Sequence, residues 1–415
     1  MRIFYQFGIN IYWFIIRCFA LFNDKAKCFI KGRKNWKTSL QAIRKADEKY
    51  IWIHCASLGE FEQGRLFIEA IKIQFPQYSI CLTFFSPSGY EIRKNYDLAD
   101  IVFYLPKDSA SNAKTFLDIL KPEMSFFVKY EFWFHYLNQL KKQDIPTFLI
   151  SGIFRENQIF FKPWAGFFRN MLQMYTHLFV QDDDSLLRLK RINVLNVSVA
   201  GDTRFDRVWE ITQEDCKLEA LDHFVENEFC IVAGSTWPQD EVLLKAIMRN
   251  FPKIKMILAP HEVNISHIQQ IEAVFQEIPL IKLSSVKTPE ISNARLLIVD
   301  SVGLLSKLYR YGKIAYIGGG FGKGIHNTLE AACYGLPVVF GPNYMRFKEA
   351  CELVEIGAGF SVNTEEELIQ MVQNLQTELI RKTTGEISEN YILQKRGATQ
   401  IILNHLKKND VFQKE

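Results

Sequence analysis

The chain has 415 residues, of which 48% are hydrophobic and 23% charged, and its formal net charge is +4. This length fits two domains better than one, and the apolar content excludes a largely disordered chain. A net charge this small argues against a nucleic-acid-binding protein, which usually carries a basic field over a whole domain.

The N-terminal segment is the most apolar part of the sequence. Residues 3–16 carry no charge, and the apolar stretch resumes after Arg17 and continues to residue 22. A spanning helix needs about 20 predominantly apolar residues, so residues 1–24 are predicted to anchor the chain to a membrane, either across it or in its plane. A buried amphipathic helix and a signal peptide are the alternatives, although no small-residue cleavage site is present. Six basic residues follow and favour a cytoplasmic location for the rest of the chain: Lys25, Lys27, Lys31, Arg33, Lys34 and Lys37.

From residue 50 onward, short apolar runs alternate with longer amphipathic segments. This alternation predicts a parallel sheet covered by helices on both faces, and we assign residues 38–205 to an N-terminal Rossmann-like domain. The predicted strands are YIWIHC, SICLTFF, DIVFYL, MSFFVKY, PTFLIS and HLFVQ, and the clearest helices between them are residues 62–75 and 109–120.

The pattern pauses near residues 206–226, which are predicted to be a linker, and then restarts. The later strands are FCIVAGS, IKMILAP, RLLIVD, KIAYIGG and PVVFG, so residues 227–385 form a second Rossmann-like domain. Residues 386–415 are predicted to be helical and to be able to pack back on the first domain. Ligands bind beyond the carboxyl ends of parallel strands, so two such sheets facing each other would form a cleft.

Two carboxylates follow strands of the first domain. Glu60 ends "CASLGE", in which Ser57 and Glu60 fit the S-x-x-E capping box of a helix start, with the carboxylate bonded back to the backbone. The same glutamate at a strand end is equally placed to act as a general base. Glu131, in "KYEFWF", lies among aromatic residues and either pairs with Lys129 or Arg155 or contacts a substrate, and its position favours the substrate.

The second domain contains a glycine-rich loop between a strand and a helix, "YIGGGFGKGIHNTLEAA", from Tyr316 onward. It matches neither the Walker loop nor G-x-G-x-x-G, yet it has more glycines than a turn requires, which favours a phosphate-binding loop of another kind. Within it, Asn327 and Glu330 are placed either to stabilise the helix start or to bind a ribose. Ser235 and Thr236, in "AGSTW", either cap a helix or hydrogen-bond a phosphate.

No metal site is predicted. The eight cysteines include no C-x-x-C pair, and several lie in apolar runs as expected of free core residues in a reducing compartment. Asp182, Asp183 and Asp184 precede a helix, where capping explains them better than a metal does. The histidines show no H-x-x-x-H pair.

Taken together, "CASLGE", "KYEFWFHYL", "AGSTWPQDE" and "IGGGFGKGIHNTLEAACYGLPVVFGPN" resemble the motifs of bacterial 3-deoxy-D-manno-octulosonic acid (Kdo) transferases specific for lipid A. The likeness extends over nearly the whole chain. It implies a GT-B fold of two Rossmann-like domains facing a cleft, with a membrane-anchoring helix. Residues 38–205 would then bind the acceptor, and residues 227–385 would bind the nucleotide sugar. The implied activity is inverting transfer of Kdo from CMP-Kdo to a lipid A precursor in lipopolysaccharide core biosynthesis. That reaction needs no cofactor, since CMP-Kdo is a substrate, and it takes place at the cytoplasmic face of the inner membrane.

The resemblance also implies roles for single residues. Glu60 is expected to be the general base, and Ser57, Gly59 and Glu131 are expected to bind substrate. The donor nucleotide is assigned to Ser235, Thr236, His261, Gly319, Gly320, Lys323, His326, Asn327 and Glu330.

One motif departs from the family. Relatives often carry P-R-H-P-E-R where this chain has "APHEVN", so the arginine expected at the donor phosphate is absent and Lys323 or Arg346 is left to supply the charge. The alternatives are another GT-B nucleotide-sugar transferase or epimerase, and a non-catalytic nucleotide-binding protein tethered to the membrane. An epimerase would have no use for the N-terminal anchor.

Overall fold

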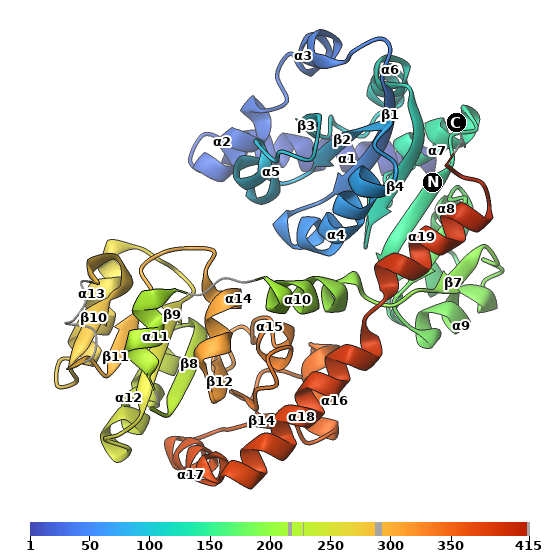
Figure 1. The fold of residues 1–415 in the computed structure, drawn as a ribbon. Coiled ribbons are helices and arrows are strands. Elements are labelled where there is room, and N and C mark those ends of the chain that lie inside the picture. The colour runs from blue at the N-terminus through green and yellow to red at the C-terminus, as the bar shows by residue number, and fades with distance from the viewer. Residues whose placement is uncertain (215–217, 227, 287–292, 413–415) are drawn as a thin grey trace. The chain divides into compact units, whose positions relative to one another are not determined.

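The computed structural model describes residues 1–415 except 215–217, 227, 287–292 and 413–415. The chain forms two compact units. The first combines residues 1–207 with residues 397–415, and the second contains residues 208–396. Each unit is built around a seven-stranded parallel sheet with helices packed against it (Figure 1).

The strands of the first unit are arranged in the order β3-β2-β1-β4-β5-β6-β7. Each of the six strands predicted in this region is present, whereas β7, with three residues, was not predicted. The elements are α1 Arg2–Phe19, α2 Asp24–Lys31, α3 Trp36–Ile43, β1 Lys49–Cys55, α4 Leu58–Gln74, β2 Tyr78–Phe84, α5 Pro87–Arg93, β3 Ile101–Tyr104, α6 Ala110–Leu120, β4 Pro122–Val128, α7 Phe134–Lys142, β5 Thr147–Gly152, η1 Ile159–Phe161, α8 Gly166–Leu172, β6 His177–Val180, α9 Asp183–Arg191, β7 Val197–Val199 and α19 Ala398–Lys408.

The central strand β1 is buried on both faces because its side chains alternate between two cores. Trp52 belongs to one hydrophobic cluster, and Ile51 and Ile53 belong to the other. His54 therefore points to the same face as Trp52, two residues earlier. This alternation brings a polar ring into a core that is otherwise aromatic and aliphatic.

The C-terminal helix α19 packs on the first unit (Figure 1). Ile402, Leu403 and Leu406 join the core beneath α4, and Phe412 stacks on Phe75 with ring centroids 3.8 Å apart. At the start of α19, the carboxylate of Asp206 accepts hydrogen bonds from the backbone N–H groups of residues 397 and 399. The segment predicted as one helix over 386–415 is thus divided between the two units.

Docking of α19 is expected to depend on pH through His177, which lies against His405 of that helix with ring centroids 4.2 Å apart. Burial, and then His405, lowers the pKa of His177 to about 4, from an ordinary value of about 6.5. The neutral ring is favoured in the folded protein, so this stabilisation is complete above about pH 6.5 and is lost as the pH falls towards 4. We expect the melting temperature of His177→Phe to fall less steeply over that range than the wild type. Parallel pH profiles would contradict this assignment.

The second unit has the strand order β10-β11-β9-β8-β12-β13-β14. The five predicted strands are present, and the short edge strands β10 and β14 were not predicted. The predicted linker contains α11 and most of α10, which crosses from one unit to the other. The elements are α10 Thr203–Gln213, α11 Glu219–Val225, β8 Cys230–Thr236, α12 Pro238–Asn250, β9 Lys255–Pro260, α13 Ile265–Val274, β10 Leu280–Lys282, η2 Leu283–Ser285, β11 Leu296–Ile298, α14 Leu305–Leu308, η4 Tyr309–Tyr311, β12 Ile314–Ile317, α15 Leu329–Ala332, β13 Val338–Phe340, α16 Lys348–Glu355, β14 Gly359–Ser361, α17 Glu365–Gln376 and α18 Glu378–Lys395.

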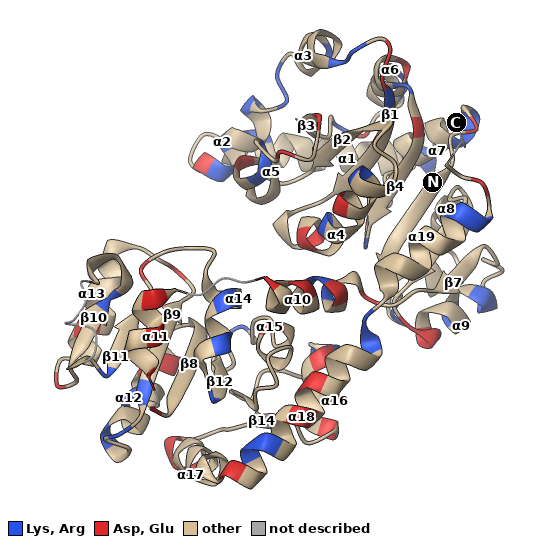
Figure 2. Cartoon of the chain, viewed as in Figure 1, with Lys and Arg blue, Asp and Glu red and all other residues tan. Residues whose placement is uncertain are grey.

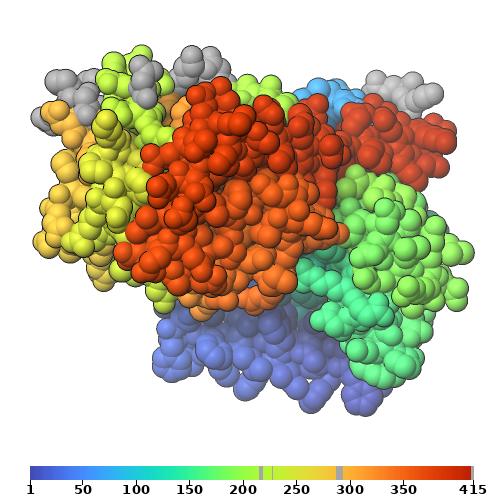
Figure 3. Space-filling view, turned by 90° about the horizontal axis from the view of Figure 1, so that it is seen from below, coloured from blue at the N-terminus to red at the C-terminus, as the bar shows by residue number. Residues whose placement is uncertain are grey.

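The long helix α18 lies on the surface of the second unit, over the segment that contains α15 and α16 (Figure 3). Tyr391 and Lys395 both bond to the carboxylate of Glu352 on α16, and Ser388 donates to the carbonyl oxygen of Leu336. These contacts assign α18 to the unit that carries the glycine-rich loop.

The N-terminal helix α1 has one face on the first unit and one in solvent. Trp13 is buried, and the Tyr5 hydroxyl donates to Asp108, the pKa of which burial raises to about 6. Phe4, Phe7 and Phe14 are 63–73% exposed. Basic residues follow on α2 and in the segment leading to α3 (Figure 2). Within the described part of the chain, no helix has the length and apolarity needed to cross a bilayer.

Candidate functional site

In the first unit, the candidate residues follow β1 and β4, which are neighbours at the centre of the sheet. The chain order reverses between these two strands, and ligands of open α/β sheets bind at such a point. Glu60 lies in the first turn of α4, directly after β1, and Glu131 lies three residues after β4. Burial raises the pKa of the Cys55 thiol, and Glu60 and Glu131 raise it further, so both carboxylates lie near that thiol.

The start of α4 shows how Glu60 is held. Ser57 is the N-cap, and its hydroxyl oxygen accepts the N–H of Gly59 at 3.2 Å while its O–H donates to the carboxylate of Glu60. The predicted capping box is therefore half formed. The carboxylate bonds to the serine hydroxyl instead of the backbone, and Glu60 stays partly exposed. Gly59 is exposed, and a Cβ at that position would meet only Ser57 Oγ, at 3.7 Å.

Glu131 is held differently, because only 4% of the residue is exposed. Its Oε2 accepts from His54 Nε2 at 2.9 Å and from Trp133 Nε1 at 2.5 Å. The expected alternative partners were Lys129 and Arg155, and neither hydrogen-bonds this carboxylate in the described structure. Lys129 has a left-handed backbone, with φ of 71°, which turns the chain sharply at the strand end.

Two cations, Arg155 and Arg204, lie in range of the Tyr130 phenol, as Glu60 does. Burial raises the pKa of the Tyr130 phenol. Glu60 and Asp202 raise that pKa further, whereas Arg155 and Arg204 lower it, so the phenol lies in range of all four charges. Arg155 had been considered only as a partner for Glu131. Arg204 was not singled out, since it follows the short strand β7, which was itself not predicted.

Arg204 is positioned by a buried network. Its guanidinium bonds to Asp202 at 2.8–2.9 Å, and the Nε2 of Gln63 donates to the same carboxylate at 3.1 Å. Burial alone would raise the pKa of Asp202, but Arg204 and these hydrogen bonds hold it below its usual value. Thr203 links the ends of two strands to α4, bonding to Ser151 and to the carbonyl oxygen of Gln63. The network fixes a cation near the partly exposed Glu60.

In the second unit, the glycine-rich loop follows β12, which is the neighbour of β8 at the corresponding reversal of strand order. Its glycines permit close packing of backbone on backbone. A Cβ on Gly318 would lie 2.3 Å from Ser235 O, and one on Gly320 would lie 2.5 Å from Gly341 N. Gly319 has φ of +89°, a conformation that side chains disfavour.

Most of the glycine N–H groups are already used inside the unit. Gly318 donates to Gly234 O, Gly319 donates to the carboxylate of Asp240, and Gly322 and Gly324 both donate to Gly319 O. The sequence interpretation had assigned these amides to an anion. Of the five glycines in the loop, Gly320 is the one whose N–H has no backbone or side-chain partner among the described residues.

Asp240 on α12 ties the loop to the helix start. Besides Gly319, its carboxylate accepts from the N–H of Trp237 at 2.8 Å and from the hydroxyl of Tyr316 at 2.8 Å. Burial raises the pKa of Asp240, and these three donors act against that rise. The helix is capped at Trp237 through Asp240 and not by Ser235 or Thr236.

Those two residues have different surroundings. Thr236 is fully buried, and its hydroxyl donates to Glu241 at 3.0 Å. Ser235 is partly exposed and has a left-handed backbone, with φ of 54°. Ser235 is therefore the one whose side chain can reach a ligand at the end of β8.

Three rings form a stack beside this junction. His261 lies between Trp237, at 4.8 Å, and His326, at 4.3 Å, and Trp237 Nε1 donates to His326 Nε2 at 3.2 Å. Burial, and then His261, lowers the pKa of His326 to about 4, so the ring is neutral at pH 7 and cannot supply positive charge. His261 itself is exposed.

The remaining donor-site candidates lie on the loop and the helix after it. Asn327 accepts the N–H of Leu329 and donates to the carboxylate of Glu330 at 2.9 Å, which orients that carboxylate. Lys323 is exposed, and its carbonyl oxygen accepts from the guanidinium of Arg346. The two cations considered as replacements for the missing arginine thus lie together at the loop.

Asp182 caps α9 by accepting the N–H of Ser185 at 2.8 Å, which agrees with the capping interpretation. Over the described ranges, no group of three His, Cys, Asp or Glu side chains is arranged to hold a metal ion.

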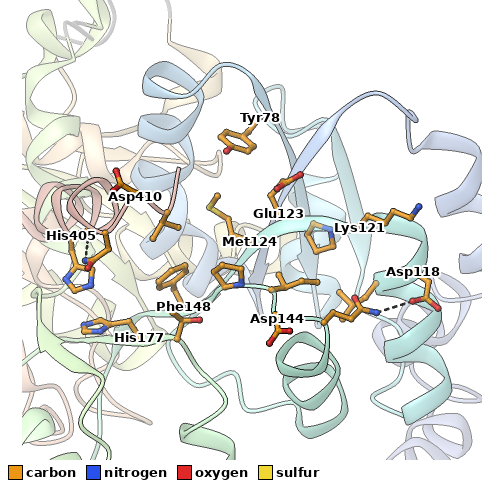
Figure 4. Close-up of a pocket in the computed structure, with 18 residues that line it drawn as sticks. Tyr78, Asp118, Lys121, Glu123, Met124, Asp144, Phe148, His177, His405 and Asp410 are labelled. Carbon is orange, nitrogen blue, oxygen red and sulfur yellow. Dashed lines mark hydrogen bonds between the residues drawn. The ribbon is translucent and has the colours of Figure 1, made fainter. Parts of the chain in front are cut away.

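A cavity of about 1130 Å³ lies at the amino ends of strands in the first sheet (Figure 4). Its lining includes residues at the amino ends of β4, β5 and β6, whereas Glu60 and Glu131 follow carboxyl ends of strands. Asp118, Glu123, Asp144 and Asp410 surround it, with His177 and His405 on one side. Its position separates it from the candidate catalytic residues.

Comparison with known proteins relates the chain to one family. A model described as 3-deoxy-D-manno-octulosonic-acid transferase (kdotransferase) matches residues 34–207. The 3-deoxy-D-manno-octulosonic acid transferase of Aquifex aeolicus (strain VF5) is 28% identical over 334 residues, which cover 78% of this chain and 85% of that protein. The chain is thus similar to Kdo transferases over most of its length. The transferase of the same description from Rickettsia bellii (strain RML369-C) is 27% identical, with 78% and 79% covered.

Members of the Kdo transferase family are glycosyltransferases, and the fold agrees with that class. The structure of UDP-GlcNAc 2-epimerase from Neisseria meningitidis bound to UDP-GlcNAc superposes with a TM-score of 0.62. It is 17% identical and covers 87% of this chain and 100% of that one. This likeness and the two parallel sheets confirm the α/β, GT-B-type class, at the level of fold alone.

Proposed function

We propose that the chain catalyses inverting transfer of Kdo from CMP-Kdo to a lipid A precursor in lipopolysaccharide core biosynthesis. The observation that carries this proposal is the position of Glu60. It lies at the strand-order reversal, in the unit that matches the family model, as a partly exposed carboxylate held by Ser57 with cations nearby.

In the proposed reaction, a hydroxyl of the acceptor attacks the anomeric carbon of Kdo as the bond from that carbon to the phosphate oxygen of CMP breaks. The hydroxyl proton passes to Glu60, and CMP leaves with the bonding electrons. A base in this role contributes about 10²–10⁴-fold. Because the displacement is single, the configuration inverts without a covalent enzyme intermediate.

The acceptor side of this proposal uses Arg204 and Arg155. A lipid A precursor carries phosphate groups, and a planar guanidinium binds phosphate through paired N–H donors. Arg204 is the better positioned of the two, because Asp202 and Gln63 hold it in place. We assign it to an acceptor phosphate and Glu60 to the acceptor hydroxyl.

The donor side uses the second unit. Four groups lie at the loop after β12: the free N–H of Gly320, the Ser235 hydroxyl and the cations Lys323 and Arg346. Together they can hold the departing phosphate without a metal. Glu330, oriented by Asn327, is assigned to the ribose hydroxyls.

The direct test is mass analysis of the product formed from CMP-Kdo and a defined lipid A precursor. We expect the acceptor to gain one or more Kdo residues and CMP to be released in equal number. CMP release without a glycosylated acceptor, or transfer only from another nucleotide sugar, would overturn the proposal. An epimerase would change the sugar of the donor and leave the acceptor unmodified.

We further propose that α1 attaches the protein to the cytoplasmic face of the inner membrane by lying in the membrane plane. Its exposed phenylalanines, with the basic residues that follow, have the composition of an interfacial helix. Its other face contributes Tyr5 and Trp13 to the first unit. Deleting the helix would therefore expose the surface that these residues cover, as well as remove the anchor.

Substitution of only the exposed face separates these effects. We expect the triple variant Phe4→Ser, Phe7→Ser, Phe14→Ser to move from the membrane to the soluble fraction, with little change in melting temperature. As a control, three exposed apolar residues elsewhere, Leu195, Ile265 and Val302, are changed to serine. Equal membrane binding by both variants would refute attachment through α1.

A further inference from the structure

A buried chain of hydrogen bonds leads to Glu131 from the interior of the first sheet. Trp52 Nε1 donates to Thr83 Oγ1 at 2.8 Å, Thr83 Oγ1 lies 2.8 Å from His54 Nδ1, and His54 Nε2 lies 2.9 Å from Glu131 Oε2. The three interior residues are all 0% exposed. The network crosses neighbouring strands, since His54 on β1 is paired in register with Thr83 on β2.

The two ends of this chain favour one direction for its hydrogen bonds. An indole N–H only donates, and an ionised carboxylate only accepts. Thr83 Oγ1 accepts from Trp52, and it lies closer to His54 Nδ1, at 2.8 Å, than the carbonyl oxygen of Thr83 does, at 3.1 Å. We take the hydroxyl to donate to Nδ1, which leaves the imidazole proton on Nε2, facing Glu131. With the proton on Nδ1 instead, the ring would donate to a Thr83 oxygen, and Glu131 would lose a donor in a buried setting.

The network leaves one oxygen of Glu131 available. Both donors, His54 and Trp133, bond to Oε2, and Oε1 has no hydrogen-bond partner in the part of the chain that the structure describes. The backbone is fixed as well, because the hydroxyl of Tyr175 donates to Glu131 O. Glu131 is thus held as an acceptor with one oxygen in a defined orientation, in contrast to the partly exposed Glu60.

We propose that Trp52, Thr83 and His54 form a positioning relay, which sets the His54 tautomer so that Glu131 presents Oε1 to a hydroxyl of the bound substrate. This inference rests on the proposed transfer reaction. Glu131 then binds and orients the reacting sugar, and proton removal is left to Glu60. His54 and Thr83 touch no substrate and act through Glu131.

The relay can be tested with nearly isosteric variants of one hydroxyl. Thr83→Val removes the hydrogen bond to His54 while keeping a β-branched strand residue, and Thr83→Ser restores the hydroxyl. Thr147→Val is the matched control. Thr147 is a buried threonine of β5, bonded to Ser125 at 2.9 Å and to Ile145 O at 3.0 Å, with no link to Glu131.

We expect Thr83→Val to lower kcat for Kdo transfer roughly 10-fold to 100-fold, the order of loss that misplacing a reacting group causes. KM for CMP-Kdo should change little, Thr83→Ser should restore most of the rate, and Thr147→Val should keep it. Because Thr83 acts through Glu131, adding Thr83→Val to Glu131→Gln should cause little further loss. Additive losses in that double variant, or equal losses in Thr83→Val and Thr147→Val, would overturn the relay.

A measurement that does not depend on turnover separates this inference from the proposed function. In the ¹⁵N spectrum of the histidine-labelled protein, the ring of His54, assigned by its absence from His54→Gln, should be neutral with the proton on Nε2. Thr83→Val should disturb that signal, and Thr83→Ser should preserve it. A proton on Nδ1, or an imidazolium, would refute the relay even if transfer is observed. Failure of transfer with the expected spectrum would count against the proposed function alone.

Discussion

Replacing Glu60 with glutamine is expected to lower Kdo transfer about 10²-fold to 10⁴-fold with the fold intact, because the variant cannot take the acceptor proton. The amide oxygen of glutamine still accepts from the Ser57 hydroxyl, so the start of α4 keeps its hydrogen bonds. Steady-state rates with CMP-Kdo and a lipid A precursor, measured beside the melting temperature, give both quantities.

Glu69→Gln is the control for this variant. Glu69 lies on the same helix and bonds to Arg65 at 2.8 Å, and its substitution should leave transfer unchanged. If Glu60 served only the helix start, Glu60→Ala would cost about 1 kcal/mol of stability and spare turnover. Near-complete activity in Glu60→Gln would exclude the carboxylate as the base.

A second large effect is expected at Gly320, where alanine should destabilise the second unit by about 3 kcal/mol. The added Cβ would lie 2.5 Å from Gly341 N and 2.6 Å from its Cα, so two backbone segments would have to separate. The same change would move the N–H assigned to the donor phosphate. Denaturant unfolding measures the first consequence, and CMP-Kdo binding measures the second.

Gly322→Ala gives the matched comparison for stability. Gly322 lies two residues further along the same loop, but its nearest neighbours to a Cβ are Gln239 Oε1 at 3.4 Å and Gly319 O at 3.7 Å. Its free energy of unfolding should remain within about 0.5 kcal/mol of the wild type. Equal destabilisation by both substitutions would mean that loop flexibility, and not close packing, is what the glycines provide.

Gly320 and Gly322 differ in a way that the sequence alone does not predict. A cluster of glycines after a strand predicts a loop of special geometry, and the loop is present after β12. The sequence does not tell which N–H groups remain available, because that depends on the carbonyls and on Asp240, which come from other elements. The amides assigned to an anion are, for the most part, bonded within the protein.

Glu60 and Arg204 show the same limit in the first unit. Glu60 was predicted because a capping motif and a strand end coincide within a few residues. Arg204 and the relay through Thr83 depend on contacts between residues far apart in the sequence, and Arg204 follows a strand too short to be predicted. Periodicity therefore predicted 11 of the 14 strands in the described part of the chain but few of the side-chain partners.

The return of α19 to the first unit has a consequence for biosynthesis. The chain leaves that unit after Arg207 and re-enters it at Gly397, so the entire second unit is inserted into the first. At about 5–20 residues per second, the ribosome takes roughly 10–40 s to make the inserted segment. Throughout that interval, the core surface that Leu403 and Leu406 will cover has no covering helix. The nascent first unit is thus an expected client for chaperones that protect apolar surfaces, and it can complete its fold only after α19 has been synthesised.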